Sequence, residues 1–143
     1  MMRKPFLFNL LLLAIPLMLG MGPLQGQGTL EKIPTPVKNY TATFVDQMDV
    51  VTECAEVSID GNTFLEGKRG EGNYTVSFDN IQQMVLRMNA ERLTGHLMLR
   101  DGGTIELVLN KDKKVYGRTN YGTFQIKLAD LKKVLLNAVQ HKK

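Results

Sequence analysis

The sequence of 143 residues contains one cysteine, two histidines and no tryptophan. The lone cysteine, Cys54, excludes a disulfide framework within the chain, so stability has to come from the packing of the core. The two histidines, His96 and His141, leave few side chains for acid–base catalysis. No Cys-x-x-Cys-His motif occurs, which excludes covalently attached haem. The sequence therefore predicts a protein that is not an enzyme and that carries no cofactor.

The N-terminal segment carries charge only at its start. Arg3 and Lys4 precede an uncharged, mostly apolar run over residues 5–20, and glycines follow that run. This order is typical of a secretory signal peptide, and we assign it to residues 1–28. The alternative is a retained membrane anchor, but the prolines within the run argue against an unbroken spanning helix. We expect an exported protein of the periplasm or extracellular space, whose contact with a membrane is at most peripheral once the signal is removed.

Residues 29–39 contain Pro34 and Pro36 and show no hydrophobic period, which predicts a flexible leader. Residues 40–143 are long enough for one domain with a single core. Within this domain, apolar alternation recurs in short runs that are separated by Asp, Asn and Gly turn signals. These signals predict an all-β fold, either a small antiparallel barrel or a two-sheet sandwich.

The domain contains an internal repeat. At an offset of fifty residues, residues 54–84 lie over residues 104–134, and nine of the eleven apolar residues in the first segment coincide with apolar residues in the second. The glycines that bound the central loop of each segment coincide as well. We therefore predict two tandem copies of about fifty residues, repeat one over residues 40–88 and repeat two over residues 93–140. Because one copy has too few strands to cover its apolar face, we expect the copies to pack face to face.

Two segments of the repeats carry a helical signal. Leu128, Leu131, Leu135 and Ala138 follow a helical spacing, which predicts a short C-terminal helix over residues 129–140. In the first repeat, Asp79 and Asn80 predict a single helical turn that carries Ile81 and Met84, and residues 85–88 fit either an extension of that helix or another strand. The pattern leaves these two interpretations open.

Soft-metal ligands are present but sparse. Cys54, His96 and Met98 are weak candidates for a soft-metal site. The competing interpretation is that cysteine and methionine fill gaps in a core that lacks tryptophan. We therefore predict no metal centre, and we keep these three residues only as weak candidates.

Basic and aromatic residues alternate in one part of the second repeat. They are Lys111, Lys113, Lys114, Tyr116, Arg118 and Tyr121. Such a cluster is typical of nucleic-acid binding in small barrels. The signal peptide argues against a nucleic-acid partner, so we interpret the cluster as a candidate surface for a protein partner.

The two halves of the chain differ in charge. Residues 29–84 hold four basic and nine acidic side chains, and residues 85–143 hold twelve basic and five acidic ones. This split predicts a protein partner, or self-association, through the oppositely charged halves. We therefore expect an exported non-enzymatic interaction or scaffold module of the cell envelope. The alternative is a periplasmic carrier of a small ligand or a soft metal ion.

Overall fold

The computed structural model describes residues 32–137, so the predicted signal peptide and the end of repeat two lie outside the described part of the chain. Residues 32–137 form ten β-strands and two short 3-10 turns, with no α-helix. The strands are β1 (Ala42–Asp46), β2 (Val51–Ile59), β3 (Phe64–Arg69), β4 (Gly72–Ser77), β5 (Ile81–Asn89), β6 (Arg92–Leu99), β7 (Thr104–Leu109), β8 (Lys114–Thr119), β9 (Gly122–Lys127) and β10 (Leu131–Leu136), and the turns are η2 (Phe78–Asn80) and η3 (Leu128–Asp130). All strand pairings are antiparallel, which confirms the predicted all-β fold.

Helices long and apolar enough to span a membrane are absent from the described part of the chain.

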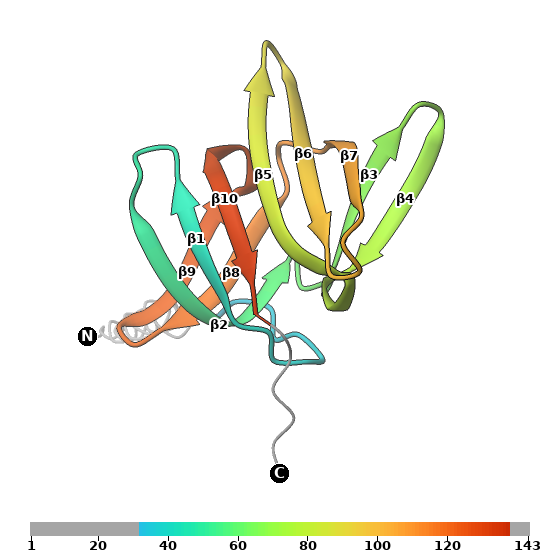
Figure 1. Ribbon diagram of the computed structural model, residues 1–143. Helices are drawn as coiled ribbons and strands as arrows, with labels where there is room; N and C mark the ends of the chain where they lie inside the picture. Colours follow the sequence, from blue (N-terminus) through green and yellow to red (C-terminus); the bar gives the residue numbers. More distant parts are fainter. Residues whose placement is uncertain (1–31, 138–143) are drawn as a thin grey trace, which may run out of the picture. The chain divides into compact units, whose positions relative to one another are not determined.

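The strands join into a single sheet, in the order β4-β3-β7-β6-β5-β10-β1-β2-β8-β9. This sheet curls into a half-barrel (Figure 1), where the sequence had predicted a barrel or a two-sheet sandwich. The reason is the pairing of β5 with β10, which joins the two halves of the chain edge to edge. The sheet therefore continues across both halves, and it ends at β4 and at β9, each of which has one neighbour.

The two halves exchange a hairpin. The β3–β4 hairpin follows β2 in the chain, but β3 pairs with β7 of the second half. In the same way, β8 of the β8–β9 hairpin pairs with β2 of the first half. At the centre of the sheet, Met84 of β5 lies opposite Val134 of β10, exactly fifty positions later in the chain. The strand order therefore has a two-fold symmetry. If β1 is matched with β6, β2 with β7, and so on to β5 with β10, the order read from one end of the sheet is the same as the order read from the other end.

The expected C-terminal helix over residues 129–140 is wrong where the chain is described, because Leu131–Leu136 form strand β10. The helical spacing has another cause. The pairing of β10 with β1 shifts register near Leu131, and such an irregularity inserts a residue into the strand. As a result Leu131 and Val134, three residues apart, are both buried. Leu135, which a helix would have turned toward the core, is only half-buried.

The first half repeats this irregularity. The helical turn predicted over residues 81–84 is wrong, because these residues belong to strand β5, and residues 85–88, for which helix and strand were both open, belong to the same strand. The pairing of β5 with β6 shifts register between Ile81 and Gln83. Ile81 and Met84 are therefore both buried although they are three residues apart in a strand.

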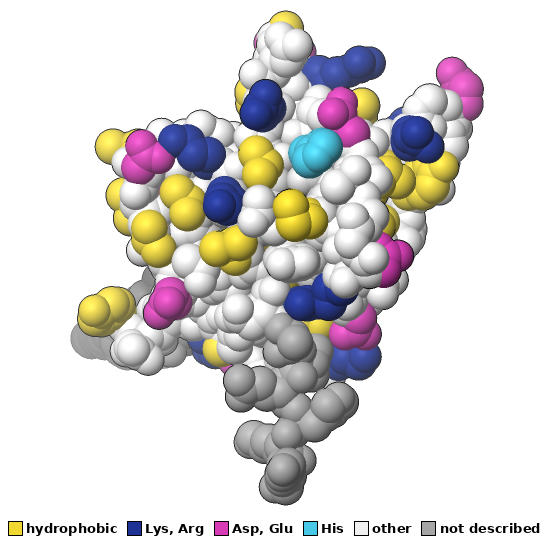
Figure 2. Space-filling view, viewed as in Figure 1, with side chains coloured by type: hydrophobic (Ala, Val, Ile, Leu, Met, Phe, Trp, Pro, Cys, Tyr) yellow, Lys and Arg dark blue, Asp and Glu magenta, His cyan; other side chains and the backbone are white. Residues whose placement is uncertain are grey.

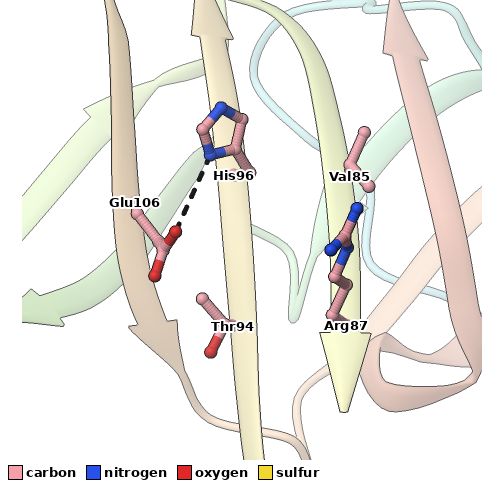
Figure 3. Close-up of a pocket in the computed structure, with 5 residues that line it drawn as sticks. All are labelled: Val85, Arg87, Thr94, His96 and Glu106. Atoms are coloured by element: carbon pink, nitrogen blue, oxygen red, sulfur yellow. Dashed lines mark ion pairs between the residues drawn. The ribbon is translucent and has the colours of Figure 1, made fainter. Parts of the chain in front are cut away.

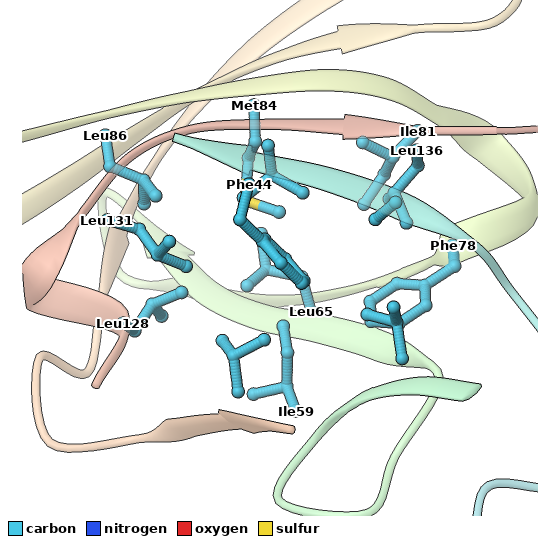
Figure 4. Close-up of a cluster of buried hydrophobic side chains, with 14 of the residues drawn as sticks. Phe44, Ile59, Leu65, Phe78, Ile81, Met84, Leu86, Leu128, Leu131 and Leu136 are labelled. Carbon is cyan, nitrogen blue, oxygen red and sulfur yellow. The ribbon is translucent and has the colours of Figure 1, made fainter. Parts of the chain in front are cut away.

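The curled sheet encloses one hydrophobic core. Its buried side chains come from eight strands and both turns, and the largest include Phe44, Leu65, Phe78, Leu97, Leu107 and Leu128. Figure 4 shows the rings of Phe44 and Phe78 among these aliphatic side chains. The space left within this cluster measures only about 10 Å³. Such a space holds at most a single water molecule, so the core has no room for a larger ligand.

A polar contact ties the segment before β1 to the turn η2. The buried Tyr40 hydroxyl donates a hydrogen bond to Asp79 Oδ1 at 2.6 Å, and Lys38 Nζ lies 3.1 Å from Asp79 Oδ2. Burial, followed by this hydrogen bond, raises the pKa of Tyr40 to about 12. The hydrogen bonds from Tyr40 and Lys38 hold the pKa of Asp79 below its usual range. The contact therefore stabilises a neutral tyrosine beside an ionised carboxylate.

We expect Tyr40→Phe to lower the free energy of unfolding by about 1–2 kcal/mol at neutral pH, because one hydrogen bond to a charged group is lost. Since the pKa of Asp79 is lowered, this difference from the wild type should shrink as the pH falls through the folded-state pKa of Asp79. The pKa of Tyr40 is raised, so its effect on stability depends on pH in the opposite direction. The stabilisation by Tyr40 is fully present below pH 10.0, the ordinary pKa of tyrosine, and it is lost as the pH rises toward the folded-state pKa of about 12. Urea denaturation of both proteins across this pH range measures the difference.

The control is Tyr121→Phe, since Tyr121 is 99% exposed. That variant should match the wild type at every pH. A difference between Tyr40→Phe and the wild type that did not vary between acid and neutral pH would contradict a role for ionised Asp79.

Candidate functional site

The outer face of the sheet, which points away from the core, carries hydrophobic and cationic side chains together. Along each strand, side chains alternate between the two faces. Phe44, Met84 and Val134 are buried, so their neighbours Val45, Val85 and Leu135 point outward and are half-buried. On the face shown in Figure 2, hydrophobic side chains are interspersed with lysine and arginine side chains.

The strand register places these side chains in rows across the outer face. In one row Val45 lies opposite Lys133, Lys133 opposite Val85, and Val85 opposite His96. In the next row the register aligns Thr43, Leu135, Gln83 and Met98. The central part of the outer face is therefore a mixed surface, on which apolar side chains lie beside a lysine and other polar side chains.

A shallow hollow of about 310 Å³ lies on this face, lined by Val85, Arg87, Thr94, His96 and Glu106. Figure 3 shows that these side chains come from three adjacent strands, β5, β6 and β7. His96 Nδ1 lies 3.8 Å from Glu106 Oε2, so the acidic and imidazole groups form one side of the hollow. Arg87 lies on the opposite side.

A second hollow, of about 680 Å³, adjoins the first because both are lined by Val85 and Arg87. Its other lining residues are Gln47, Leu86, Met88, Ala129 and Lys132. We call the two hollows together the outer groove.

The outer groove forms where β5 separates from β10. The two strands pair only from Gln83 to Val85 on β5, and Figure 1 shows the β5–β6 hairpin extending beyond β10. The next residues of β5, including Arg87 and Met88, therefore border open space. Gln47 closes one end, since its backbone N–H donates to Asp130 O at 2.9 Å and its side-chain amide donates to Leu131 O at 3.0 Å.

The outer groove carries the cationic side chains of Arg87 and Lys132. Lys132 forms an ion pair with Asp49. For Arg87, residues 32–137 provide no ion-pair partner, which leaves its guanidinium available to an anionic group. The groove contains no cysteine or serine nucleophile beside a histidine. Its chemistry suits an extended partner that carries apolar and acidic groups.

The weak soft-metal candidates do not come together. Cys54 of β2 is buried in the core, whereas His96 and Met98 of β6 are exposed on the outer face. Three strands, β5, β10 and β1, lie between β6 and β2 in the sheet. Burial raises the pKa of the Cys54 thiol to about 11, which keeps it protonated. Among the described residues, no group of three His, Cys, Asp or Glu side chains is arranged to hold a metal ion.

The basic cluster lies on β8 and the turns at its two ends, and most of its cations are engaged within the molecule. Lys111 pairs with Glu91, Lys113 with Asp60 and Arg118 with Glu56, at 2.6, 3.8 and 2.6 Å. Lys114 and Tyr116 lie along β8, and Tyr121 at the β8–β9 turn is almost fully exposed. The cluster is therefore less cationic as a surface than its sequence suggests.

The exchange of hairpins explains where the opposite charges of the two halves meet. It brings β8 beside β2, so that Glu56 and Asp60 of the acidic half reach Arg118 and Lys113 of the basic half. Much of the charge asymmetry between the halves is thus compensated inside one molecule.

Sequence reasoning did not find the outer groove. Val85, Arg87 and Met88 lie in the segment for which helix and strand were both open. The sequence therefore did not determine which of these side chains point to the core and which point to the surface. The available signal was the alternation of Met84 and Leu86 with Val85 and Arg87, which indicates a strand with an arginine on one face.

Comparisons with known proteins identify a family but no function. No curated protein and no solved structure matches the chain. A family model described as "Uncharacterised protein" matches residues 36–138. Because this match covers well over half of the chain, the protein belongs to that family.

Proposed function

We propose that this protein is an exported, non-enzymatic interaction module of the cell envelope that binds a protein partner at the outer groove. The observation that carries the proposal is the combination of half-buried Val85 with Arg87 in the outer groove, on a face that no other part of the described chain covers. Export rests on the signal-peptide pattern of residues 1–28.

The groove suits an acidic, extended segment of the partner. An aliphatic side chain of that segment packs on Val85, and a carboxylate pairs with Arg87, whose guanidinium favours two parallel hydrogen bonds to carboxylate. Apolar contact supplies most of the affinity, and the arginine supplies the orientation.

We further propose that the domain arose by internal duplication. Each of β3, β4 and η2 begins and ends fifty residues before its counterpart among β8, β9 and η3. The symmetric strand order and the matching register shifts in β5 and β10 support this proposal.

The carrier of a small ligand or a soft metal ion is the weaker proposal. Its support would be an internal cavity or a convergent set of ligands, and the core leaves about 10 Å³ of free space. A carried ligand would therefore have to occupy a hollow on the surface, such as the outer groove or the hollow of about 460 Å³ beside β3 and β4.

Site-specific photo-crosslinking tests the proposed interaction. We expect a benzophenone residue in place of Val85, in cells that produce the full chain, to give an adduct with one partner protein. Arg87→Glu should weaken that adduct by about tenfold, because it opposes the carboxylate of the partner with a like charge.

Two controls make the test specific. Arg92→Glu changes the net charge equally at an exposed position outside the groove, and it should leave the adduct unchanged. Benzophenone in place of Tyr121 probes the basic cluster. An adduct from position 121 without one from position 85 would refute the outer groove as the binding site and would support the basic cluster instead.

A further inference from the structure

Both ends of the sheet are open to strand pairing. Within residues 32–137, β4 pairs only with β3, and β9 pairs only with β8. The Phe78 N–H donates to Thr63 O at 3.0 Å, and the Leu128 N–H donates to Lys113 O at 2.8 Å. Since antiparallel strands alternate their hydrogen-bonding directions, the backbone groups of Asn73, Thr75 and Ser77 on β4, and of Thr123, Gln125 and Lys127 on β9, point away from the sheet.

These edges lack the features that usually prevent pairing between molecules. Free edges are commonly protected by prolines, bulges or several charged residues. β4 and β9 have the sequences Gly-Asn-Tyr-Thr-Val-Ser and Gly-Thr-Phe-Gln-Ile-Lys, with no proline and a single charge at Lys127. Neither strand shows a register shift against its neighbour.

The core-facing sides of the two edges are also incompletely covered. Val76 of β4 and Phe124 and Ile126 of β9 pack against the core but are only partly buried. Tyr74 of β4 is 39% exposed. A strand added at either edge would extend the sheet and cover these side chains.

We propose that a second copy of this chain occupies these edges, with β4 of one molecule pairing antiparallel with β9 of the next. In the register that we propose, Thr75 lies opposite Thr123, and Tyr74 lies opposite Phe124 on the core-facing side. The same register brings Glu71, in the turn immediately before β4, to the position opposite Lys127 at the end of β9, so that the ends of the two strands meet with opposite charges.

Charge favours this pairing over the two symmetric ones. Lys127 is the charged residue of β9, and Glu71 lies in the turn immediately before β4. A β4–β4 pair brings no cation close to Glu71, and a β9–β9 pair brings no acid close to Lys127. Pairing of unlike edges is heterologous, and it extends from molecule to molecule unless the assembly closes into a ring. The edges lie at the two ends of the sheet, away from the outer groove, so this inference does not depend on the proposed function.

Cysteine crosslinking of the full chain tests the pairing and its register. Directly opposed residues of an antiparallel pair have Cα atoms about 5.5 Å apart, which a disulfide bridges. We expect a mixture of Thr75→Cys and Thr123→Cys proteins to form mixed disulfide dimers under mild oxidation, at a yield well above that of either variant alone. Dimers of one variant only would show a symmetric pairing and overturn the proposal, as would a yield no higher than that of wild-type protein, whose Cys54 is buried.

A charge exchange provides the second measurement. Lys127→Glu should weaken self-association in sedimentation velocity by roughly fivefold, since like charges directly opposite each other destabilise a strand pair. Combining it with Glu71→Lys should restore the association, and circular dichroism verifies that both variants are folded. Failure of the double variant to recover, with both variants folded, would refute the register. Because neither residue lines the outer groove, crosslinking from position 85 should be unaffected, which separates this test from that of the proposed function.

Discussion

Replacement of Phe44 by alanine is expected to reduce the free energy of unfolding by about 3–5 kcal/mol, the usual cost of removing a buried phenylalanine ring. Phe44 is 1% exposed and lies on β1, where its ring stacks on that of Phe124 with centroids 5.6 Å apart. It links the centre of the sheet to the edge strand β9. Since single domains are typically stable by about 5–15 kcal/mol, the variant should retain only part of its stability.

Urea denaturation followed by far-ultraviolet circular dichroism measures this loss. Val45→Ala is the matched control, because Val45 is the next residue of the same strand and points to the outer face. It should cost about 1 kcal/mol or less. Similar losses for Phe44→Ala and Val45→Ala would contradict the assignment of Phe44 to the core.

Gly117→Ala is expected to cost about 1–3 kcal/mol through overpacking of the contact between β8 and β2. A Cβ atom at Gly117 would lie 2.7 Å from Cys54 Cβ and 3.0 Å from Cys54 Sγ. The nearest atom is bonded directly to the backbone of β2, so it cannot move away without moving the strand. The corresponding glycine of the first half, Gly67, would meet Leu107 Cβ at 2.8 Å.

Gly72→Ala is the control for Gly117→Ala, since its Cβ would have only ordinary contacts, the nearest at 3.5 Å. It should leave the denaturation midpoint nearly unchanged. A double-mutant cycle identifies the cause, because Cys54→Gly removes the atom that clashes. We expect the double variant to lose at least about 1 kcal/mol less free energy of unfolding than the sum of the losses in the two single variants. Strict additivity would show that the loss does not arise from this contact.

Most strands and turns were predictable because their signals are local, although β2 and β3, which a turn connects, do not pair with each other. The alternation of Tyr74, Val76 and Phe78, and of Phe124, Ile126 and Leu128, marks β4 and β9 and the turns after them. Turn residues such as Asp60 and Gly61 mark the connection between β2 and β3. These features depend only on residues that are close together in the chain.

The C-terminal strand was mispredicted because a register shift changes the period of its buried residues. In a regular strand the core-facing residues are two positions apart, but Leu131 and Val134 are three apart. A period of three is also the signature of a helix, so the chain alone does not distinguish the two. Only the partner strand β1 shows where the extra residue lies.

The outer groove could not be predicted from the sequence for a related reason. Val85 and Arg87 adjoin it only because β5 leaves β10 after three paired residues and because β6 lies on its other side. None of these relations is visible in the segment itself. The ion pairs of the basic cluster likewise depend on the pairing of β8 with β2.

The amino-acid sequence by itself determined the all-β class, the positions of most turns and the opposite charges of the two halves, because alternation, turn residues and charge are properties of short stretches. The tertiary structure alone decided which strands became neighbours. The exchange of hairpins between halves, the joining of β5 to β10 and the free edges at β4 and β9 all arise from pairings between residues far apart in the chain. Such pairings are chosen by the burial of one shared core, and no local pattern encodes that choice.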